Sequence, residues 1–470
     1  MARSYTTTTL PQVDAVVVGA GLSGLVAAER LVAAGRTVLV LEARDRVGGK
    51  LYDPRLTTTA GYVEAGGSYI GPGQDNVKAL VERLGLGLYD NNEEGKRVSY
   101  QNGERKVHDA DELVYPEAAL IQYIGAVGKL EHMAQQLDIK TPWTHASAKA
   151  WDSLTFGSWL DSEVTDECGR ALLDVSAKSL LSAEPTEISL LQMLVYLARA
   201  TDGENPGTWA RLTGVKGGGQ ESRVRGGPQE IPRRLAATLG SAVRLNSPVT
   251  RITLREDVYE VCVETGSGIT TVDCRGVVLA LSPPLAVRIR FEPPLPARRD
   301  LLSQSMAMGS LGKAIAVYKT PFWRDEGLSG QAIGLNGTLV QVTFDSTPED
   351  GSFGAIQGFL EGNDLRELDD KTDEEIQELV KLDYVKFFGP AAADVQEWHI
   401  QRWNNEEYSR GGHFAVAGPN SITPFAKYLD EPVGNIFFAG TEVSTRWAGF
   451  MEGAVISGQV AAERLLGKLA

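Results

Sequence analysis

The first forty residues combine short apolar runs with one helical stretch. Val16 to Val18 is a run of valines typical of a buried strand, and it leads into a glycine-rich turn. Residues 22–34 follow with the composition of a helix, and Gly35 stands directly after them, where helices commonly end. A second apolar run, residues 37–41, predicts another buried strand. This order of strand, turn, helix and strand is typical of a parallel α/β unit.

The turn between the first strand and the helix has the spacing of a nucleotide-binding loop. Gly19, Gly21 and Gly24 form Gly-x-Gly-x-x-Gly, and Glu42 lies at the end of the second strand. The first glycine allows a tight turn, the second lets the backbone approach a pyrophosphate, and the third lets helix and strand pack closely. Glu42 can accept both hydrogen bonds of an adenosine ribose diol. The segment therefore predicts a dinucleotide site for an unphosphorylated ribose.

A second cofactor signal lies near the other end of the chain. Residues 437–439 form a β-like apolar run before Gly440, and we expect a helix to begin near Phe450. The residues at the start of this helix are small and rich in glycine. Free backbone N–H groups and the positive end of the helix dipole would therefore suit the electron-rich carbonyl oxygen of a reduced flavin that is named O2. One face of the helix is apolar and is expected to be buried: Met451, Ala454, Val455, Gly458, Ala461, Ala462 and Leu465.

The residues that follow Glu42 favour FAD over NAD. Arg44 is placed to reach a phosphate, and Gly48 and Gly49 give a second close backbone approach. More than 400 residues follow the nucleotide loop, and the flavin-like helix lies at their far end. An NAD site alone requires neither feature. Taken by itself, the segment RDRVGG would also fit a solvated charged turn.

Together these segments resemble the flavin-dependent amine oxidases, and most closely the monoamine oxidases. The similarity continues in order through VEAGGSYIGPGQDN (residues 63–76), residues 217–232, residues 312–324 and the C-terminal GTE…GFMEGA. It extends over nearly all of the chain. Such colinear motifs are specific for the family and less specific for its substrate.

The resemblance implies an α/β fold (α+β overall) with two domains. The FAD-binding domain is expected to be Rossmann-type and discontinuous, and the substrate-binding domain to be mixed. The first substrate segment is expected to be mainly helical, and the second to supply a strand at residues 313–318 and a helix near residues 373–388. The expected pieces are 1–90, 225–299 and 396–470 for FAD, and 91–224 and 300–395 for the substrate.

The resemblance also assigns roles to particular residues. Lys313 stands where the family keeps a lysine that holds a water against flavin N5. Phe414 and Phe450 match two aromatic positions that sandwich the substrate amine, and Gln220 matches a polar residue of the substrate cavity. Val249 matches a backbone contact to adenine, and Trp403 a tryptophan beside the isoalloxazine. The other FAD-binding positions implied by the motifs are Gly49, Lys50, Gly66, Gly67, Ser68, Tyr69, Gly440, Thr441, Glu442 and Met451.

Three departures from the family pattern matter. His413 stands where members with covalently held flavin carry a cysteine, so a thioether cannot form and non-covalent FAD is expected. A histidyl link is an alternative that the sequence leaves open. Both cage positions are phenylalanine, whereas monoamine oxidases favour tyrosine. Lys50 replaces an arginine and loses bidentate contact to phosphate.

The implied reaction is oxidative deamination of a primary amine. Hydride passes from the amine-bearing carbon to the flavin, the iminium product hydrolyses to an aldehyde or ketone plus ammonia, and O2 is reduced to H2O2. An aromatic pair can attract the amine through ring quadrupoles, worth about 0.5–2 kcal/mol. Three alternatives stay open: a polyamine oxidase with acids along a long tunnel, an L-amino-acid oxidase with a cation for the carboxylate, and a non-catalytic flavin-binding interaction protein.

Composition limits the classes of ligand and partner that the protein is expected to bind. A net charge of −15 and a pI near 5.0 argue against non-specific binding of nucleic acid. Three cysteines and five scattered histidines give no metal-ligand spacing, and free buried thiols are expected. The sequence contains no run of 18 apolar residues, so no membrane span is predicted, and the N-terminus does not resemble a secretory signal. We expect a soluble, intracellular and most simply cytoplasmic enzyme that acts on a small amine and O2. A homodimer is also expected from the family.

Overall fold

The apolar runs from both ends of the chain meet in one sheet. The structure is a computed structural model that describes residues 7–266 and 268–470. Its first sheet has mixed directions, with parallel pairing at the centre, where β12, β2 and β3 lie side by side. The strand order is β13 (Arg290–Glu292), β10 (Val249–Arg255), β11 (Val258–Thr265), β12 (Gly268–Leu279), β2 (Val13–Val18), β3 (Val38–Leu41) and β9 (Val243–Arg244), and β1 (Thr7–Thr9) and β21 (Ile436–Phe438) also pair with β12.

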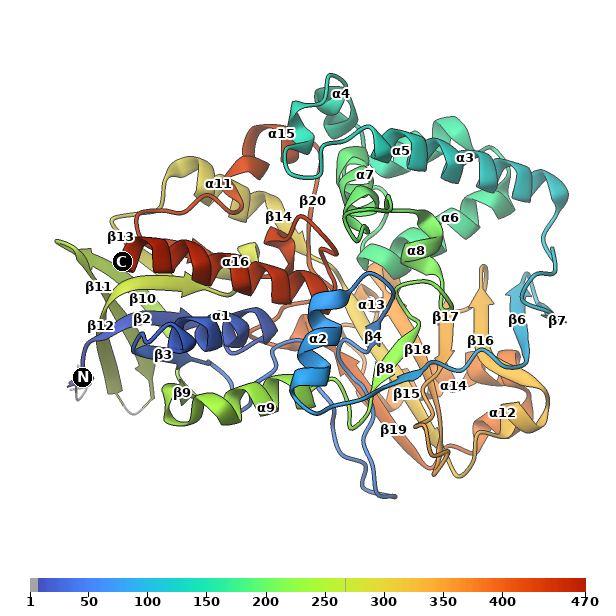
Figure 1. The fold of residues 1–470 in the computed structure, drawn as a ribbon. Coiled ribbons are helices and arrows are strands. Elements are labelled where there is room, and N and C mark those ends of the chain that lie inside the picture. The colour runs from blue at the N-terminus through green and yellow to red at the C-terminus, as the bar shows by residue number, and fades with distance from the viewer. Residues whose placement is uncertain (1–6, 267) are drawn as a thin grey trace.

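Two helices from opposite ends of the chain pack beside each other against this sheet (Figure 1). They are α1 (Leu22–Ala33) and α16 (Met451–Leu469), and α9 (Glu230–Leu239) also contacts α1. The contact is close because a Cβ at Gly458 would lie 2.3 Å from the Ser23 carbonyl oxygen. The predicted strand, helix and strand near the N-terminus, and the predicted helix after Phe450, are therefore confirmed.

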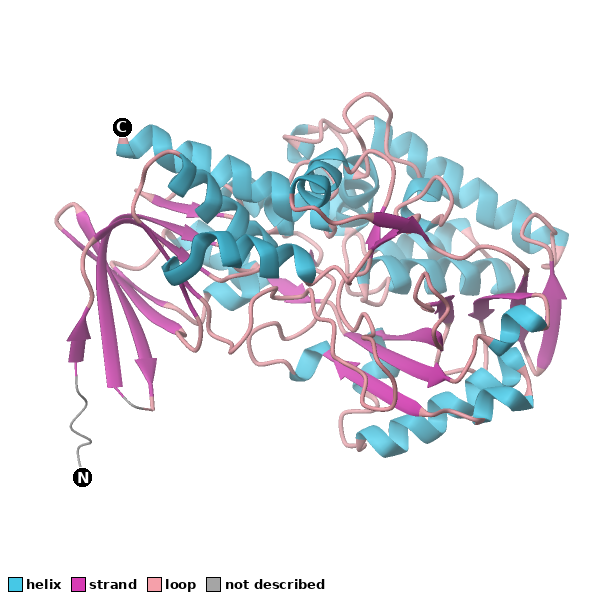
Figure 2. Ribbon diagram, turned by 60° about the horizontal axis from the view of Figure 1, so that its bottom comes forward, coloured by secondary structure: helices cyan, strands magenta, loops and turns pink. Residues whose placement is uncertain are grey.

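The second sheet lies in the other half of the molecule (Figures 1 and 2). It is antiparallel except where β16 meets β6. Its order is β19 (Glu397–Arg402), β15 (Leu311–Tyr318), β18 (Gly354–Glu361), β17 (Val342–Asp345), β16 (Leu328–Gly334), β6 (Lys96–Gln101) and β7 (Glu104–His108). Every residue of β15 is buried, and α14 (Asp373–Phe388) begins at a capping box in which Thr372 and Glu375 pair reciprocally. The strand and helix expected in this segment are confirmed.

A layer of helices covers the substrate half and supplies its apolar core. All ten residues of α7 (Leu190–Arg199) are buried. Around it lie α3 (Glu117–Gln135), α4 (Ala148–Ser153), α5 (Phe156–Glu163), α6 (Glu167–Leu181) and α8 (Trp209–Thr213). The mainly helical character expected for residues 91–224 is confirmed, with β6 and β7 as the main exceptions.

Shorter elements connect these layers. A small sheet pairs β8 (Ser222–Val224) with β4 (Tyr69–Ile70) and β5 (Leu88–Asp90), and β14 (Met306–Met308) pairs with β20 (Ala415–Ala417). The remaining helices are α2 (Asp75–Arg83), α10 (Pro283–Ala286), α11 (Ala297–Ser305), α12 (Phe322–Asp325), α13 (Gly362–Arg366) and α15 (Ile422–Phe425). Residues 397–402 pair with β15 and therefore belong to the second sheet.

Cysteines and helix lengths agree with the composition. Cys168, Cys262 and Cys274 are free and buried, and the latter two lie on the neighbouring strands β11 and β12. Over residues 7–266 and 268–470, no His, Cys, Asp or Glu cluster has the arrangement of a metal site. Over the same residues, the helices are too short or too polar to cross a bilayer.

Candidate active site

One cavity of about 1000 Å³ connects the two halves of the molecule. It begins at the carboxyl end of β2, passes the start of α16 and continues between helix α6 on one side and the strands β15 to β18 on the other. Gly24 and Phe414 are the two predicted site residues that are not on its wall. The predicted residues that line it are Gly19, Gly21, Glu42, Arg44, Gly49, Lys50, Gly66, Gly67, Ser68, Tyr69, Gln220, Val249, Lys313, Trp403, Gly440, Thr441, Glu442, Phe450 and Met451.

The nucleotide end is built on the first glycine turn. A Cβ at Gly24 would lie 2.0 Å from the Gly19 carbonyl oxygen, so this glycine serves close packing of α1, as predicted. A Cβ at Gly21 would meet no atom within 4 Å, which leaves the backbone open to a ligand. Glu42 is buried and accepts hydrogen bonds from the backbone N–H of Ala20 (2.7 Å) and of Arg44 (3.0 Å). An open glycine turn with a buried carboxylate beside it fits the adenosine part of FAD.

The cationic side chains near this turn are held by neighbouring polar groups. The Arg44 guanidinium donates to Ser409 Oγ at 2.8 Å and lies 3.4 Å from Glu406. Lys50 Nζ lies 3.9 Å from Glu442, whose Oε1 also accepts from the backbone N–H of Ala415 at 3.1 Å. Arg44 and Lys50 both face the cavity and fit the phosphate groups of FAD.

The start of α16 is fixed by a hydroxyl group. Thr441 Oγ1 accepts from the Gly449 N–H (2.6 Å) and donates to the Phe450 carbonyl oxygen (3.0 Å). Phe450 is the residue that precedes the first turn of α16, as the sequence predicted within one residue. Trp403 donates its indole N–H to the Ala65 carbonyl oxygen at 3.0 Å. These contacts shape the cavity where the resemblance expects the flavin ring.

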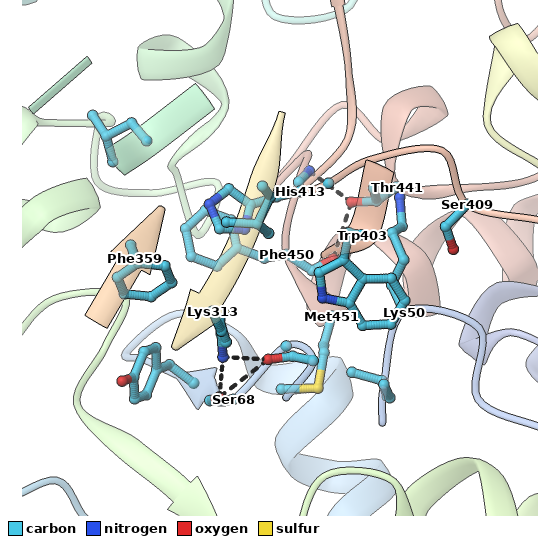
Figure 3. A pocket seen from close by; sticks show the side chains of 18 of the residues that line it. Lys50, Ser68, Lys313, Phe359, Trp403, Ser409, His413, Thr441, Phe450 and Met451 are labelled. Atoms are coloured by element: carbon cyan, nitrogen blue, oxygen red, sulfur yellow. Dashed lines mark hydrogen bonds between the residues drawn. The ribbon is translucent and has the colours of Figure 1, made fainter. Parts of the chain in front are cut away.

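Lys313 is buried on the floor of this part of the cavity (Figure 3). Its Nζ donates to the carbonyl oxygens of Glu64 (3.0 Å) and Gly66 (2.5 Å), to Ser68 Oγ (3.0 Å) and to Gln357 Oε1 (3.1 Å). Burial lowers the pKa of this lysine to about 7, although the nearby Glu64 carboxylate opposes the shift. The amine can therefore change its charge near neutral pH.

A buried ion pair supports the loop before β4, which carries the carbonyl groups of Glu64 and Gly66. The Arg223 guanidinium contacts both oxygens of Glu64 at 3.0–3.2 Å and also donates to the carbonyl oxygens of Ser346 and Thr347. Glu64 is fully buried, and Arg223 is 3% exposed. Asp53 lies nearby, and burial followed by the charge of Glu64 raises its pKa to about 8.

The two predicted cage phenylalanines have different positions. Phe450 lines the cavity and meets Trp447 edge-to-face at 4.9 Å. Phe414 is buried against Tyr196, with ring centroids 5.2 Å apart and planes 17° from parallel. Tyr196 itself lines the cavity and lies 6.5 Å from the Phe450 ring at 15°. Phe414 is thus stacked on a cavity-lining tyrosine that the sequence analysis did not identify.

The substrate end of the cavity is largely apolar. Phe344 and Phe359 line it from β17 and β18, and their rings meet edge-to-face at 6.0 Å. Gln220 donates to the Leu212 carbonyl oxygen at 2.9 Å, whereas its buried Oε1 has no hydrogen-bond partner among the described residues. Alternation along β18 could have indicated Phe359, but no motif marked Tyr196 or Phe344. The other apolar or aromatic lining residues here include Tyr69, Val175, Leu180, Leu212, Val215, Ala332, Ile333 and Val342.

His413 lines the cavity beside Phe450 (Figure 3). Its Nε2 lies 3.3 Å from the Ser179 carbonyl oxygen and 3.9 Å from Glu361 Oε1. Burial, and then the charge of Lys313, lowers the pKa of His413 to about 4. The imidazole is therefore neutral at physiological pH.

Comparisons with known proteins agree with this site. The family model for flavin containing amine oxidoreductase matches residues 22–466. A probable flavin-containing monoamine oxidase A of Dictyostelium discoideum is 32% identical, covering 97% of this chain and 98% of the relative. Amine oxidase [flavin-containing] B of Canis lupus familiaris is 34% identical, covering 96% and 86%.

Solved structures show the same relationship. Wild-type putrescine oxidase bound to putrescine has a TM-score of 0.91 and 29% identity, covering 98% of this chain and all of that one. Cyclohexylamine oxidase from Brevibacterium oxydans IH-35A has a TM-score of 0.91 and 31% identity, with the same coverage. The expected α/β fold is confirmed. The chain therefore belongs to the flavin-containing amine oxidoreductase family and is an amine-oxidising flavoenzyme.

Proposed function

We propose that the protein oxidises a primary monoamine with an apolar tail and holds FAD without a covalent bond. The observation that carries this proposal is the chemistry of the cavity wall between Lys313 and the mouth. That wall is built from β6, β7, β16–β18, α6 and α8 and is mostly apolar. A primary amine would place its nitrogen at the polar floor and its tail among the phenylalanine rings.

The charged groups on this wall disfavour the two other substrate classes. Among the described residues of these elements and of the loop between β7 and α3, the one acidic side chain that lines the cavity is Glu112, which stands on that loop. A polyamine would find no acidic row along the tunnel. The lining cations are Lys313, whose donors are occupied, and Arg97, which lies 3.2 Å from Glu93. The carboxylate of an amino acid would therefore meet no unpaired cation there.

Each residue at the reacting end has a specific role in this proposal. Gln220 Oε1 has no hydrogen-bond partner among the described residues and is the acceptor for an amine N–H, which also fixes the orientation of the substrate. The faces of Phe450 and Tyr196 hold the amine-bearing carbon and exclude water. Bound FAD would supply the hydride acceptor and pass electrons to O2. Lys313 would supply a positive charge at the floor of the cavity.

Two finer expectations belong to the same proposal. His413 has no thiol, so a thioether to the flavin cannot form, which supports non-covalent FAD. The discontinuous division into FAD-binding and substrate-binding domains is kept, with residues 397–402 contributing a strand to the substrate half. A cytoplasmic location and a homodimer stay predictions.

The experiment uses two matched substrate pairs and the visible spectrum of the holoenzyme. Phenylethylamine and L-phenylalanine differ by a carboxylate, and butylamine and putrescine differ by a second amine. Each is mixed anaerobically with the protein, and bleaching of the flavin band is followed. We expect both monoamines to bleach the band faster than their partners, and air to restore it with H2O2 release.

Three results would contradict parts of the proposal. Faster reduction by L-phenylalanine or putrescine would refute the assigned substrate class. No bleaching by any of the four amines would support a non-catalytic flavoprotein. Flavin that remains with the acid-precipitated protein would show a covalent link.

A further inference from the structure

Gln357 is a fully buried amide that no sequence motif marked. It lies on β18, and because side chains alternate along a strand, Gln357, Phe359 and Glu361 share one face. Phe359 lines the cavity, so this face is turned toward it. A buried amide costs free energy unless both of its ends are paired, so its partners indicate its function.

Both ends of this amide contact residues of the active site. Oε1 accepts from Lys313 Nζ at 3.1 Å, and Nε2 donates to Tyr69 Oη at 3.2 Å. Ammonium groups have no acceptor, so only the oxygen end can face a protonated Lys313. With the oxygen on Lys313, the NH2 end has Tyr69 Oη as its acceptor, so both ends of the amide are paired. Tyr69 lines the cavity, and burial raises the pKa of its hydroxyl well above the ordinary value, so the phenol stays neutral.

The acceptors around Lys313 match the protonated form of its amine. A protonated amine has three N–H groups, and three carbonyl-type oxygens receive them, from Glu64, Gly66 and Gln357. Ser68 Oγ is a fourth acceptor, and it also donates to the Gly66 carbonyl oxygen at 3.3 Å. A neutral amine has two N–H groups and could donate to only two of these oxygens, so one hydrogen bond from Lys313 would be lost. Gln357 therefore favours the cation, whereas burial favours the neutral form.

We propose that Gln357 is a positioning residue that keeps the Lys313 amine protonated and fixes it beside the Tyr69 hydroxyl. This inference rests on the proposed function, because it takes Lys313 to act at the flavin. A fixed cation in a site with little water stabilises the negative charge that develops on O2 as it is reduced. Gln357 should therefore set the pH range over which the reduced enzyme reacts rapidly with O2.

Other charged groups also act on Lys313 and must stay constant in a test. The charge of Glu64 favours the cation, and that of Arg223 opposes it. Burial raises the pKa of Asp53 and of Glu361 to about 8, so these two acids add a favourable charge only as they ionise toward alkaline pH, in the wild type and the variants alike. His413 faces the same amine, and its pKa is lowered in part by the charge of Lys313. None of these side chains has a hydrogen bond to Gln357 among the described residues, so replacing the amide leaves their own pairs in place.

The test compares Gln357→Leu and Gln357→Glu with the wild type and a matched control. Gln401→Leu is the control because Gln401 stands opposite Lys313 on β19, while its amide donates to Glu406 Oε1 at 3.3 Å. Each FAD-bound protein is reduced with dithionite, so no amine substrate is needed. The reduced protein is then mixed with O2 across about pH 5.5–9, and the return of the flavin band is timed.

The two substitutions should move the pH profile in opposite directions. Loss of one hydrogen bond to a charged group should shift the midpoint of Gln357→Leu by about one pH unit toward acid, with slower reoxidation at neutral pH. A carboxylate in Gln357→Glu should shift it toward alkali, and Gln401→Leu should match the wild type. Equal midpoints in wild type and both Gln357 variants would overturn the proposal, and so would an equal shift in Gln401→Leu.

The isosteric variant keeps the test decisive if the leucine variant does not bind FAD. In that case an alkaline shift in Gln357→Glu supports the proposal, and an unchanged midpoint refutes it. The assay also separates this inference from the substrate assignment. If no amine reduces the wild type but the midpoints still shift, the proposed substrate class fails and the role of Gln357 stands.

Discussion

Replacing Glu42 by glutamine tests the nucleotide end of the site with little change of shape. The carboxylate is 4% exposed and accepts two backbone N–H groups, from Ala20 and Arg44. In Glu42→Gln one of these acceptors becomes an NH2 donor and faces an N–H. One charge-assisted hydrogen bond is lost in the free protein, and a second is lost when the ribose hydroxyls of FAD bind.

The magnitude follows from those bonds. Hydrogen bonds to charged groups contribute about 1.5–3 kcal/mol each, so the Kd for FAD should rise roughly 10- to 100-fold. The assay is a fluorescence titration of the flavin-free protein with FAD, because flavin emission changes on burial. Competition with ADP should weaken by a similar factor, since ADP carries the same ribose. Thermal stability of the free protein should also fall.

A surface control separates this effect from loss of charge. Glu463→Gln removes a carboxylate that is 62% exposed and paired at 3.4 Å with Arg30 on the outside of α1, so its effect should be small. A Kd for FAD within twofold of the wild type in Glu42→Gln would refute the ribose role. Weaker FAD binding with unchanged ADP binding would place the loss at the flavin end instead.

Three further predictions concern the buried charges and the aromatic wall. Glu64→Gln leaves the Arg223 guanidinium without its buried partner and should lower the free energy of unfolding by about 3–5 kcal/mol in urea denaturation; a loss below 1 kcal/mol would show that the pair is not needed. The pKa of Asp53 is raised from 3.8 to about 8 in the folded protein, so the unfolded chain releases this proton at lower pH, and the free energy of unfolding should fall as pH rises through that interval. Asp53→Asn should therefore flatten the fall in Tm between about pH 6 and 8. An unchanged slope would contradict the assignment. Phe450→Leu should lower kcat/KM for a monoamine about 2- to 30-fold through loss of the ring face. Phe414→Leu should lower it less, because Phe450 lines the cavity whereas Phe414 is stacked on Tyr196; a larger loss in Phe414→Leu would restore Phe414 to the cage.

Local signals in the sequence predicted both ends of the cofactor site. The glycine turn after β2, the acid after β3 and the start of α16 each depend on neighbours within a few positions. Glycine spacing, an apolar run and the start of a helix each depend on a short stretch of consecutive residues, so each can be recognised from the sequence without knowledge of the rest of the fold. The family resemblance then placed Lys313 correctly on the cavity wall.

Residues whose role depends on packing between distant segments could not be predicted. Tyr196 reads as one more apolar position of a buried helix, and its place beside Phe450 depends on how α7 meets the start of α16. Gln357 reads as a polar residue within an apolar strand, and only the register of β18 against β15 brings it to Lys313. Phe414 was assigned from its motif, whereas its burial against Tyr196 depends on how α7 packs on the segment before β20.

The close pairing of α1 with α16 has a consequence for biosynthesis. These helices lie side by side with no room for a side chain at Gly458, yet 417 residues of chain (34–450) lie between them. A ribosome releases α1 early and α16 late, so the nascent nucleotide loop stays without the helix that covers it for most of translation. Stable capture of FAD must therefore wait until residues 451–469 have emerged.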